Sequence, residues 1–172
     1  MKRIGMILVI MLFAAIPASA QENTVGLTLG AAEFLEDSLS IDFSSDVQEI
    51  WYSRELEAGT VFRLKLGQAD FEVEEEDSDL PPGDYEVEYA AALIEYRFHE
   101  IYGSTTIYLG PGAYRQNVGA GDETNFGLNA GVTADFPMTR QIGVILEAGY
   151  HWVNFDEEYQ FVTIGGGFRF SF

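Results

Sequence analysis

The last five residues, Phe168-Arg169-Phe170-Ser171-Phe172, place an aromatic ring at every second position up to the C-terminus. Successive side chains of a β-strand point to opposite faces, so the three rings share one face. A row of exposed phenylalanines is unfavourable in water, whereas aromatic rings gather where a strand meets the lipid boundary. The ending therefore predicts a strand whose outer face contacts a membrane.

The opposite end of the chain carries a secretory leader. Lys2-Arg3 precedes an apolar run that reaches Ile16, and the small residues Ala18-Ser19-Ala20 follow. This order predicts a signal peptide over residues 1–20, because the apolar run is too short to cross a bilayer comfortably as a helix. We expect residues 21–172 to form one domain, without disulfides because the chain has no Cys.

Alternation with a period of two recurs along the mature chain and predicts eight strands. In one of them Val144 and Leu146 share a face that opposes Glu147 and His151. The eight strands are expected near residues 24–34, 47–56, 60–71, 85–98, 104–116, 124–136, 140–153 and 158–172.

The links between these strands alternate in length and charge. Those near 57–59, 99–103 and 137–139 are short, whereas those near 35–46, 72–84, 117–123 and 154–157 are mostly longer and acidic. With both mature ends in the periplasm, all four acidic links fall on the cell exterior. We therefore predict an all-β fold, a single eight-stranded antiparallel up-and-down transmembrane β-barrel in the outer membrane.

The net charge of the mature chain limits the kinds of partner that it can bind. Residues 21–172 hold seven basic and 28 acidic residues, a net charge of −21 with His neutral, which argues against nucleic-acid binding. The acidic run from Glu74 to Asp79 is a weak candidate for divalent cations, since carboxylate oxygens suit Ca²⁺ and Mg²⁺. A plain solvated loop is the simpler interpretation. The candidate ligands are Glu74, Glu75, Glu76, Asp77 and Asp79.

Inward positions of the predicted barrel collect charged residues. Eight strands enclose only enough room for side chains, so no wide pore is expected. Buried charges need partners, and we predict an ionic network that fills the lumen. Its expected members are Glu95, Glu147, Arg63, Lys65, Arg97 and Arg169, with Glu55 as a weaker member. A gated ion path is the functional alternative to this polar filling.

The sequence offers few candidate catalytic residues. His151 is expected to face inward near the outer rim, with Glu147 on the same strand face and Thr163 or Phe161 beside it. No inward Ser lies next to it, and no metalloprotease, nucleophile-elbow or phosphate-loop motif occurs. We therefore expect no enzyme activity and no cofactor.

The leader, the eight-strand layout, the segment Tyr108–Tyr114 and the terminal Phe168–Phe172 pattern together resemble the small outer-membrane β-barrel proteins, including the opacity-protein and OmpA-type barrels. The resemblance covers residues 21–172. It implies a monomer in lipid and lipopolysaccharide, and an outer-membrane assembly machinery that reads Phe168, Phe170 and Phe172. The leading prediction is a structural or surface barrel without an open pore, whose acidic outer loops contact the environment, ions or a partner. Alternatives are a narrow channel or transporter of small or hydrophobic molecules, and a lipid A-modifying enzyme.

Overall fold

The computed structural model describes residues 22–35, 45–57, 59–73, 83–118, 121–154 and 158–172. These residues form the strands β1 (Asn23–Phe34), β2 (Ser45–Glu57), β3 (Thr60–Val73), β4 (Gly83–His99), β5 (Ser104–Val118), β6 (Gly121–Pro137), β7 (Ile142–Asn154) and β8 (Glu158–Ser171). Each strand pairs antiparallel with the next, and β8 pairs with β1. The predicted eight-stranded up-and-down barrel is confirmed. The predicted signal peptide, residues 1–20, lies outside the described residues.

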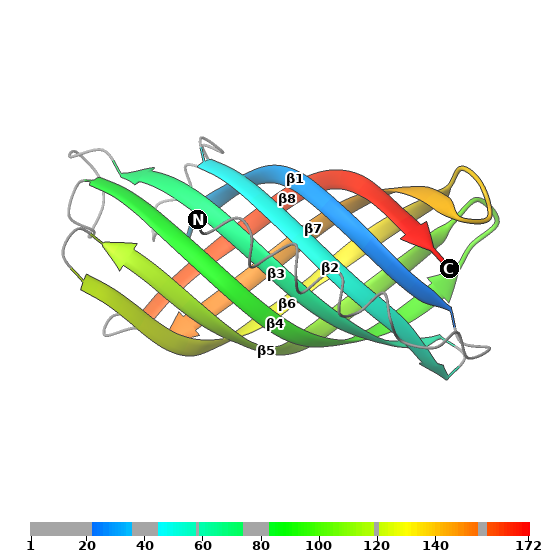
Figure 1. Cartoon of the computed structure of the whole chain (residues 1–172), viewed down its shortest axis with the longest axis horizontal. Helices are drawn as coiled ribbons and strands as arrows, with labels where there is room; N and C mark the ends of the chain where they lie inside the picture. Colours follow the sequence, from blue (N-terminus) through cyan, green and yellow to red (C-terminus); the bar gives the residue numbers. More distant parts are fainter. Residues whose placement is uncertain (1–21, 36–44, 58, 74–82, 119–120, 155–157) are drawn as a thin grey trace.

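The strands cross the barrel obliquely, and the two ends differ (Figure 1). The right-hand end in this view holds the C-terminus and the short connections β2–β3, β4–β5 and β6–β7; we call it the inner end and the opposite end the outer end. Gly59 turns the chain between β2 and β3 with a φ of +83°, a conformation that favours glycine. Within the described part of the chain, no helix is long and apolar enough to cross a membrane.

In the central and inner parts of the barrel, the outward side chains are mostly apolar and the charged side chains are buried inside. On β3, Arg63 and Lys65 are buried inside while Leu64 faces out between them. On β7, Glu147 is buried in the lumen and Leu146 is 54% exposed on the outside. This arrangement is the reverse of a water-soluble barrel and fits a bilayer around the sheet.

Near the outer end the alternation reverses. On β4, Tyr85 and Val87 are buried in the lumen while Glu86 and Glu88 point outward. β2 and β3 repeat the reversal, with Val47, Ala69 and Phe71 inside and Asp46, Gln48, Gln68 and Asp70 outside. The outer ends of these strands therefore resemble a soluble barrel, with its apolar core inside and its charged surface in water.

The predicted strand boundaries agree with the structure to within three residues. The outer link predicted near 117–123 is shorter than predicted, because β5 continues to Val118 and β6 begins at Gly121, with Asn117 opposite Asp122. Polar residues can extend a barrel strand once it has left the bilayer, so polarity alone does not mark the end of a strand. The links β2–β3, β4–β5 and β6–β7 are short, as predicted.

Candidate functional site

The middle of the lumen holds a network of ion pairs. Lys65 Nζ lies 3.1 Å from Glu49 Oε1 and also contacts Glu147. Arg63 donates to Glu147 over 3.0 Å and contacts Glu95. All five side chains are 4% exposed or less, so they are held by one another rather than by bulk solvent. We call these residues, from β2, β3, β4 and β7, the central ionic network.

Aromatic and hydroxyl groups complete this network. Tyr108 donates to Glu147 over 2.8 Å, and Tyr89 donates to Glu49 over 2.5 Å. The Arg63 guanidinium lies 4.1 Å from the centre of the Trp51 ring, a cation–π distance. Charge-assisted hydrogen bonds of this kind fix the geometry of buried ionic groups. The arrangement can hold the wall strands in register.

The predicted network members fall into separate groups. Arg63, Lys65, Glu95 and Glu147 come together, and Glu49 is an additional member that the sequence analysis missed. Arg169 does not join them, because its Nε pairs with Asp135 over 2.5 Å near the inner end.

Two further predicted members form none of these pairs. Arg97 has an Nε atom without a hydrogen-bond partner among the described residues. Glu55 is partly exposed beside the irregular register at the end of β2.

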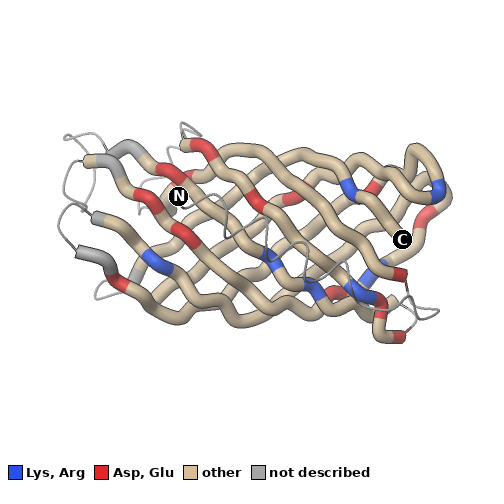
Figure 2. Tube along the Cα trace, viewed as in Figure 1, with Lys and Arg blue, Asp and Glu red and all other residues tan. Residues whose placement is uncertain are grey.

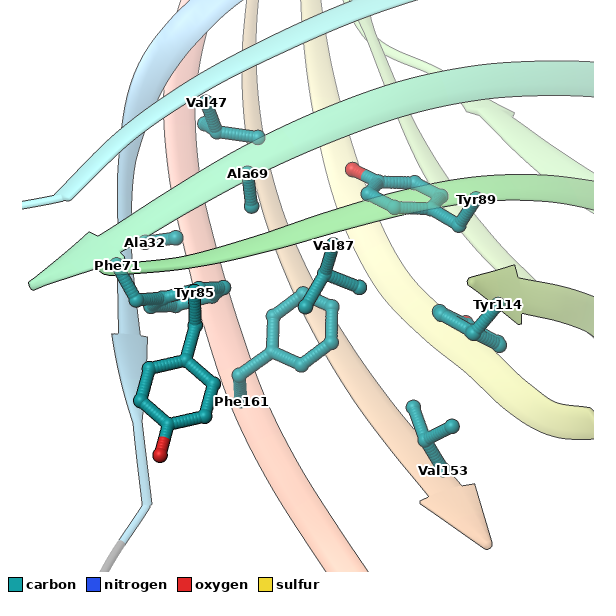
Figure 3. Packing of buried hydrophobic residues seen from close by; sticks show 10 residues of the cluster. All are labelled: Ala32, Val47, Ala69, Phe71, Tyr85, Val87, Tyr89, Tyr114, Val153 and Phe161. Atoms are coloured by element: carbon teal, nitrogen blue, oxygen red, sulfur yellow. The ribbon is translucent and has the colours of Figure 1, made fainter. Parts of the chain in front are cut away.

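Above the central network, towards the outer end, the lumen is apolar. Phe34 and Phe71 stack with ring centres 4.0 Å apart, and Phe161 meets Phe71 edge-on at 5.5 Å. We call the cluster the aromatic layer; its buried members are Ala32, Val47, Ala69, Phe71, Tyr85, Val87, Tyr89, Tyr114, Val153 and Phe161, which come from every strand except β6 (Figure 3). The expectation of an ionic lumen was therefore wrong for the outer part of the barrel.

His151 lies at the inner border of the aromatic layer. Its ring stacks on Phe161, with centres 4.2 Å apart and planes 7° apart. Asn129 Nδ2 lies 3.1 Å from each ring nitrogen, and Tyr114 Oη lies 3.1 Å from Nδ1. The predicted inward orientation and the neighbour Phe161 are confirmed. The ring is completely buried.

Glycines on the lumen wall leave space for the large aromatic rings inside the barrel. A Cβ on Gly67 would lie 2.2 Å from the Tyr89 ring, and one on Gly131 would lie 2.4 Å from Tyr108 Oη. Only a residue without a side chain leaves room for these rings, so the wall and the filling fit each other.

A band of exposed apolar side chains surrounds the barrel. Leu109 is 58% exposed and Ile94 is 53% exposed. At the inner end of β8, Phe168 and Phe170 face outward, and the Phe172 ring packs 6.1 Å from that of Phe170. Backbone hydrogen bonds between Phe172 and Asn23 close the barrel beside these rings. The three terminal phenylalanines thus form part of the apolar outer surface.

Acidic residues crowd the outer end (Figure 2). Asp46 lies opposite Asp70, and Asp70 lies opposite Glu86, so three outward carboxylates follow one row across β2, β3 and β4. The predicted cation ligands at 74–77 and 79 lie outside the described residues. Among the described residues, no group of three or more His, Asp and Glu is placed to hold a metal.

A closed antiparallel barrel with an apolar band outside and polar groups in its lumen is the architecture of outer-membrane β-barrels. The chain is a protein of this class. No protein-family model matches it, and no curated protein matches it.

Solved structures share its fold. The chain is similar to a major outer membrane protein from Thermus thermophilus, with a TM-score of 0.64 and 13% identity over 90% of this chain and 100% of that one. For Neisserial surface protein A the TM-score is 0.60, with 12% identity over 91% and 100% of the two chains. Ail, the attachment invasion locus protein of Yersinia pestis, gives a TM-score of 0.54 and 20% identity over 87% and 98%. Ail has also been solved with the heparin analogue sucrose octasulfate.

Proposed function

We propose that the protein is a non-enzymatic surface barrel without an open pore, whose acidic outer end contacts ions or a partner outside the cell. The aromatic layer carries the proposal. Its buried rings and aliphatic side chains fill the outer part of a lumen that is only wide enough for side chains. Beneath it, the charges of the central ionic network pair with one another rather than lining a path for ions.

The outer end favours cationic partners. Like charges directly opposite each other destabilise a sheet, so cations or basic groups against the row Asp46, Asp70 and Glu86 would stabilise it. Among the described residues of this end, Arg115 is the basic one, and it pairs with Glu88 over 3.6 Å. A polyanion such as the heparin analogue solved with Ail is therefore a poor match for this chain, as is nucleic acid.

The remaining partners follow from the membrane setting. The apolar band would contact outer-membrane lipid, and the acidic end would face lipopolysaccharide. Divalent cations would bridge the acidic end and lipopolysaccharide, and the acidic segment 74–79 would be a further place where they bind. The exposed terminal rings Phe168, Phe170 and Phe172 are available for recognition by the assembly machinery before the barrel closes. We propose a monomer, because closing the barrel leaves no sheet edge to pair.

An enzymatic role for His151 is disfavoured by its surroundings. Its ring nitrogens contact Asn129 and Tyr114, and its face is covered by Phe161. A lipid A-modifying enzyme needs a nucleophile beside the base and access from the membrane. Mass spectrometry of lipid A from cells with and without the protein should give identical acyl chains, and the loss of a chain would overturn this part of the proposal.

Planar-bilayer recordings test the closed lumen. The wild-type protein should give no sustained openings. The double variant Phe71→Ala/Phe161→Ala removes two rings of the aromatic layer and should produce brief openings. Phe168→Ala, which removes a lipid-facing ring that is 63% exposed, should stay silent. Sustained, defined openings of the wild type would reject the proposal.

The aromatic layer also favours a second candidate, transport of a small hydrophobic molecule that enters from the outer end. The close ring contacts oppose it, because a ligand would have to displace packed rings. Titration with a hydrophobic fluorescent dye separates the two. Saturable binding to the wild type that Phe71→Ala alters would favour transport, and no saturable binding favours the surface barrel.

A further inference from the structure

Several buried polar atoms of the lumen have no hydrogen-bond partner among the described residues. They come from four different strands around the wall, so they do not reflect one local irregularity. They are Thr28 Oγ1, Trp51 Nε1, Glu95 Oε2, Arg97 Nε, Asn129 Oδ1 and Asp135 Oδ1.

These atoms occupy one part of the barrel. Thr28 lies opposite Glu49, and Trp51 lies opposite Lys65, which places both at the level of the central ionic network. Glu95, Arg97 and Asp135 lie on the inner-end segments of β4 and β6. Asn129 is the outermost of the six and touches His151, below the rings of the aromatic layer. We call the region lined by the other five residues the polar chamber.

Buried polar atoms in folded proteins are almost always paired, either with protein or with ordered water. A buried water needs two to four polar partners, and the polar chamber offers donors and acceptors from opposite walls. We infer that the polar chamber holds water that exchanges with the periplasm and that the aromatic layer separates it from the cell exterior. The inference rests on the closed lumen proposed above, and it adds which end of the lumen contains water.

The exposed fractions of the side chains support access of water from the inner end. At the inner rim the side chains of Arg169 and Asp135 remain 12% and 13% exposed. In the aromatic layer Tyr114 and Val153 are fully buried and Phe161 is 1% exposed. The inner route therefore begins at a polar rim, whereas the outer route crosses packed rings. Water in the chamber also lowers the desolvation cost of the nearby ion pairs.

Single-cysteine variants can test this directly, because the chain has no Cys. Thr28→Cys reports on the polar chamber, and Ala69→Cys reports on the aromatic layer. Each variant is inserted into sealed phosphatidylcholine vesicles, and Ag⁺, a water-sized ion that blocks thiols, is added outside or trapped inside. Tyr102→Cys in the exposed β4–β5 turn and Asp70→Cys at the outer rim report the orientation through an impermeant maleimide.

After unfolding, a fluorescent maleimide measures the thiols that Ag⁺ left free. We expect Thr28→Cys to lose labelling when Ag⁺ is on the inner-end side only, and Ala69→Cys to keep its labelling with Ag⁺ on either side. Full labelling of Thr28→Cys with Ag⁺ on either side overturns the wet chamber and leaves the closed lumen intact. Loss of labelling in either variant with Ag⁺ on the outer side overturns both. Ser53→Cys, at a buried inward position near the inner end of β2, replaces Thr28→Cys if that variant fails to fold.

Discussion

Replacing Lys65 with Met removes a cation from the middle of the barrel while keeping most of the side-chain volume. Breaking a buried ion pair by deleting one partner costs about 3–5 kcal/mol. Here Arg63 still contacts Glu147, and Tyr89 still donates to Glu49. The charge left without a cation is that of Glu49, so we expect the free energy of unfolding to fall by about 3 kcal/mol, the lower end of that range.

Equilibrium urea unfolding of the refolded protein in lipid vesicles measures this loss. Arg115→Met is the matched control, because the Arg115–Glu88 pair is 43% and 40% exposed and screened pairs contribute only about 0–1 kcal/mol. Adding Glu49→Gln to Lys65→Met removes the uncompensated charge and should recover part of the loss. An effect of Lys65→Met no larger than the control, or no recovery in the double variant, would refute the reasoning.

Three further changes test the packing and the orientation of the wall by the same unfolding assay. Phe161→Ala should cost about 3–5 kcal/mol, because it leaves a cavity among the rings of the aromatic layer. Gly67→Ala should cost about 1–3 kcal/mol by pushing the Tyr89 ring, whereas Gly166→Ala, whose Cβ meets Leu146 at 3.4 Å, should be nearly neutral. Leu109→Arg places a charge on the lipid face and should cost about 2–4 kcal/mol. A cost within error of zero in any of the three destabilising variants contradicts the corresponding contact.

The strands could be predicted because alternation is a local property of the sequence. Val144 and Leu146 face lipid and Glu147 faces the lumen, and three neighbouring residues suffice to reveal this. The same reasoning placed His151 inside with Thr163 or Phe161 beside it, and the register of β7 and β8 puts Phe161 opposite it.

The aromatic layer could not be predicted from the rule that lipid-facing strands are apolar outside. That rule holds only at the depth of the bilayer, and near the outer end the pattern reverses, as with Val87 inside and Glu86 outside. Glu49 was missed for a related reason. It lies between the inward apolar residues Val47 and Trp51, so the inward face of this strand was not recognised as polar.

The sequence also could not predict which charged residues would pair with each other. Lys65 and Glu147 are 82 residues apart and meet because the barrel closes. Arg169 faces the lumen as expected, but its pairing with Asp135 depends on their common position near the inner end. Alternation gives the face of each residue, whereas the partner depends on the register of all eight strands.

The central claim is that one face of each strand lies in lipid and the other in a filled lumen. Spin labels at single cysteines along β7, from Ile142 to Trp152, test it through their accessibility to oxygen dissolved in the bilayer. We predict maxima at the even positions, Val144 and Leu146 among them, and minima at the odd positions, including Ile145 and Glu147. Maxima at the odd positions, or no period of two, would contradict the account.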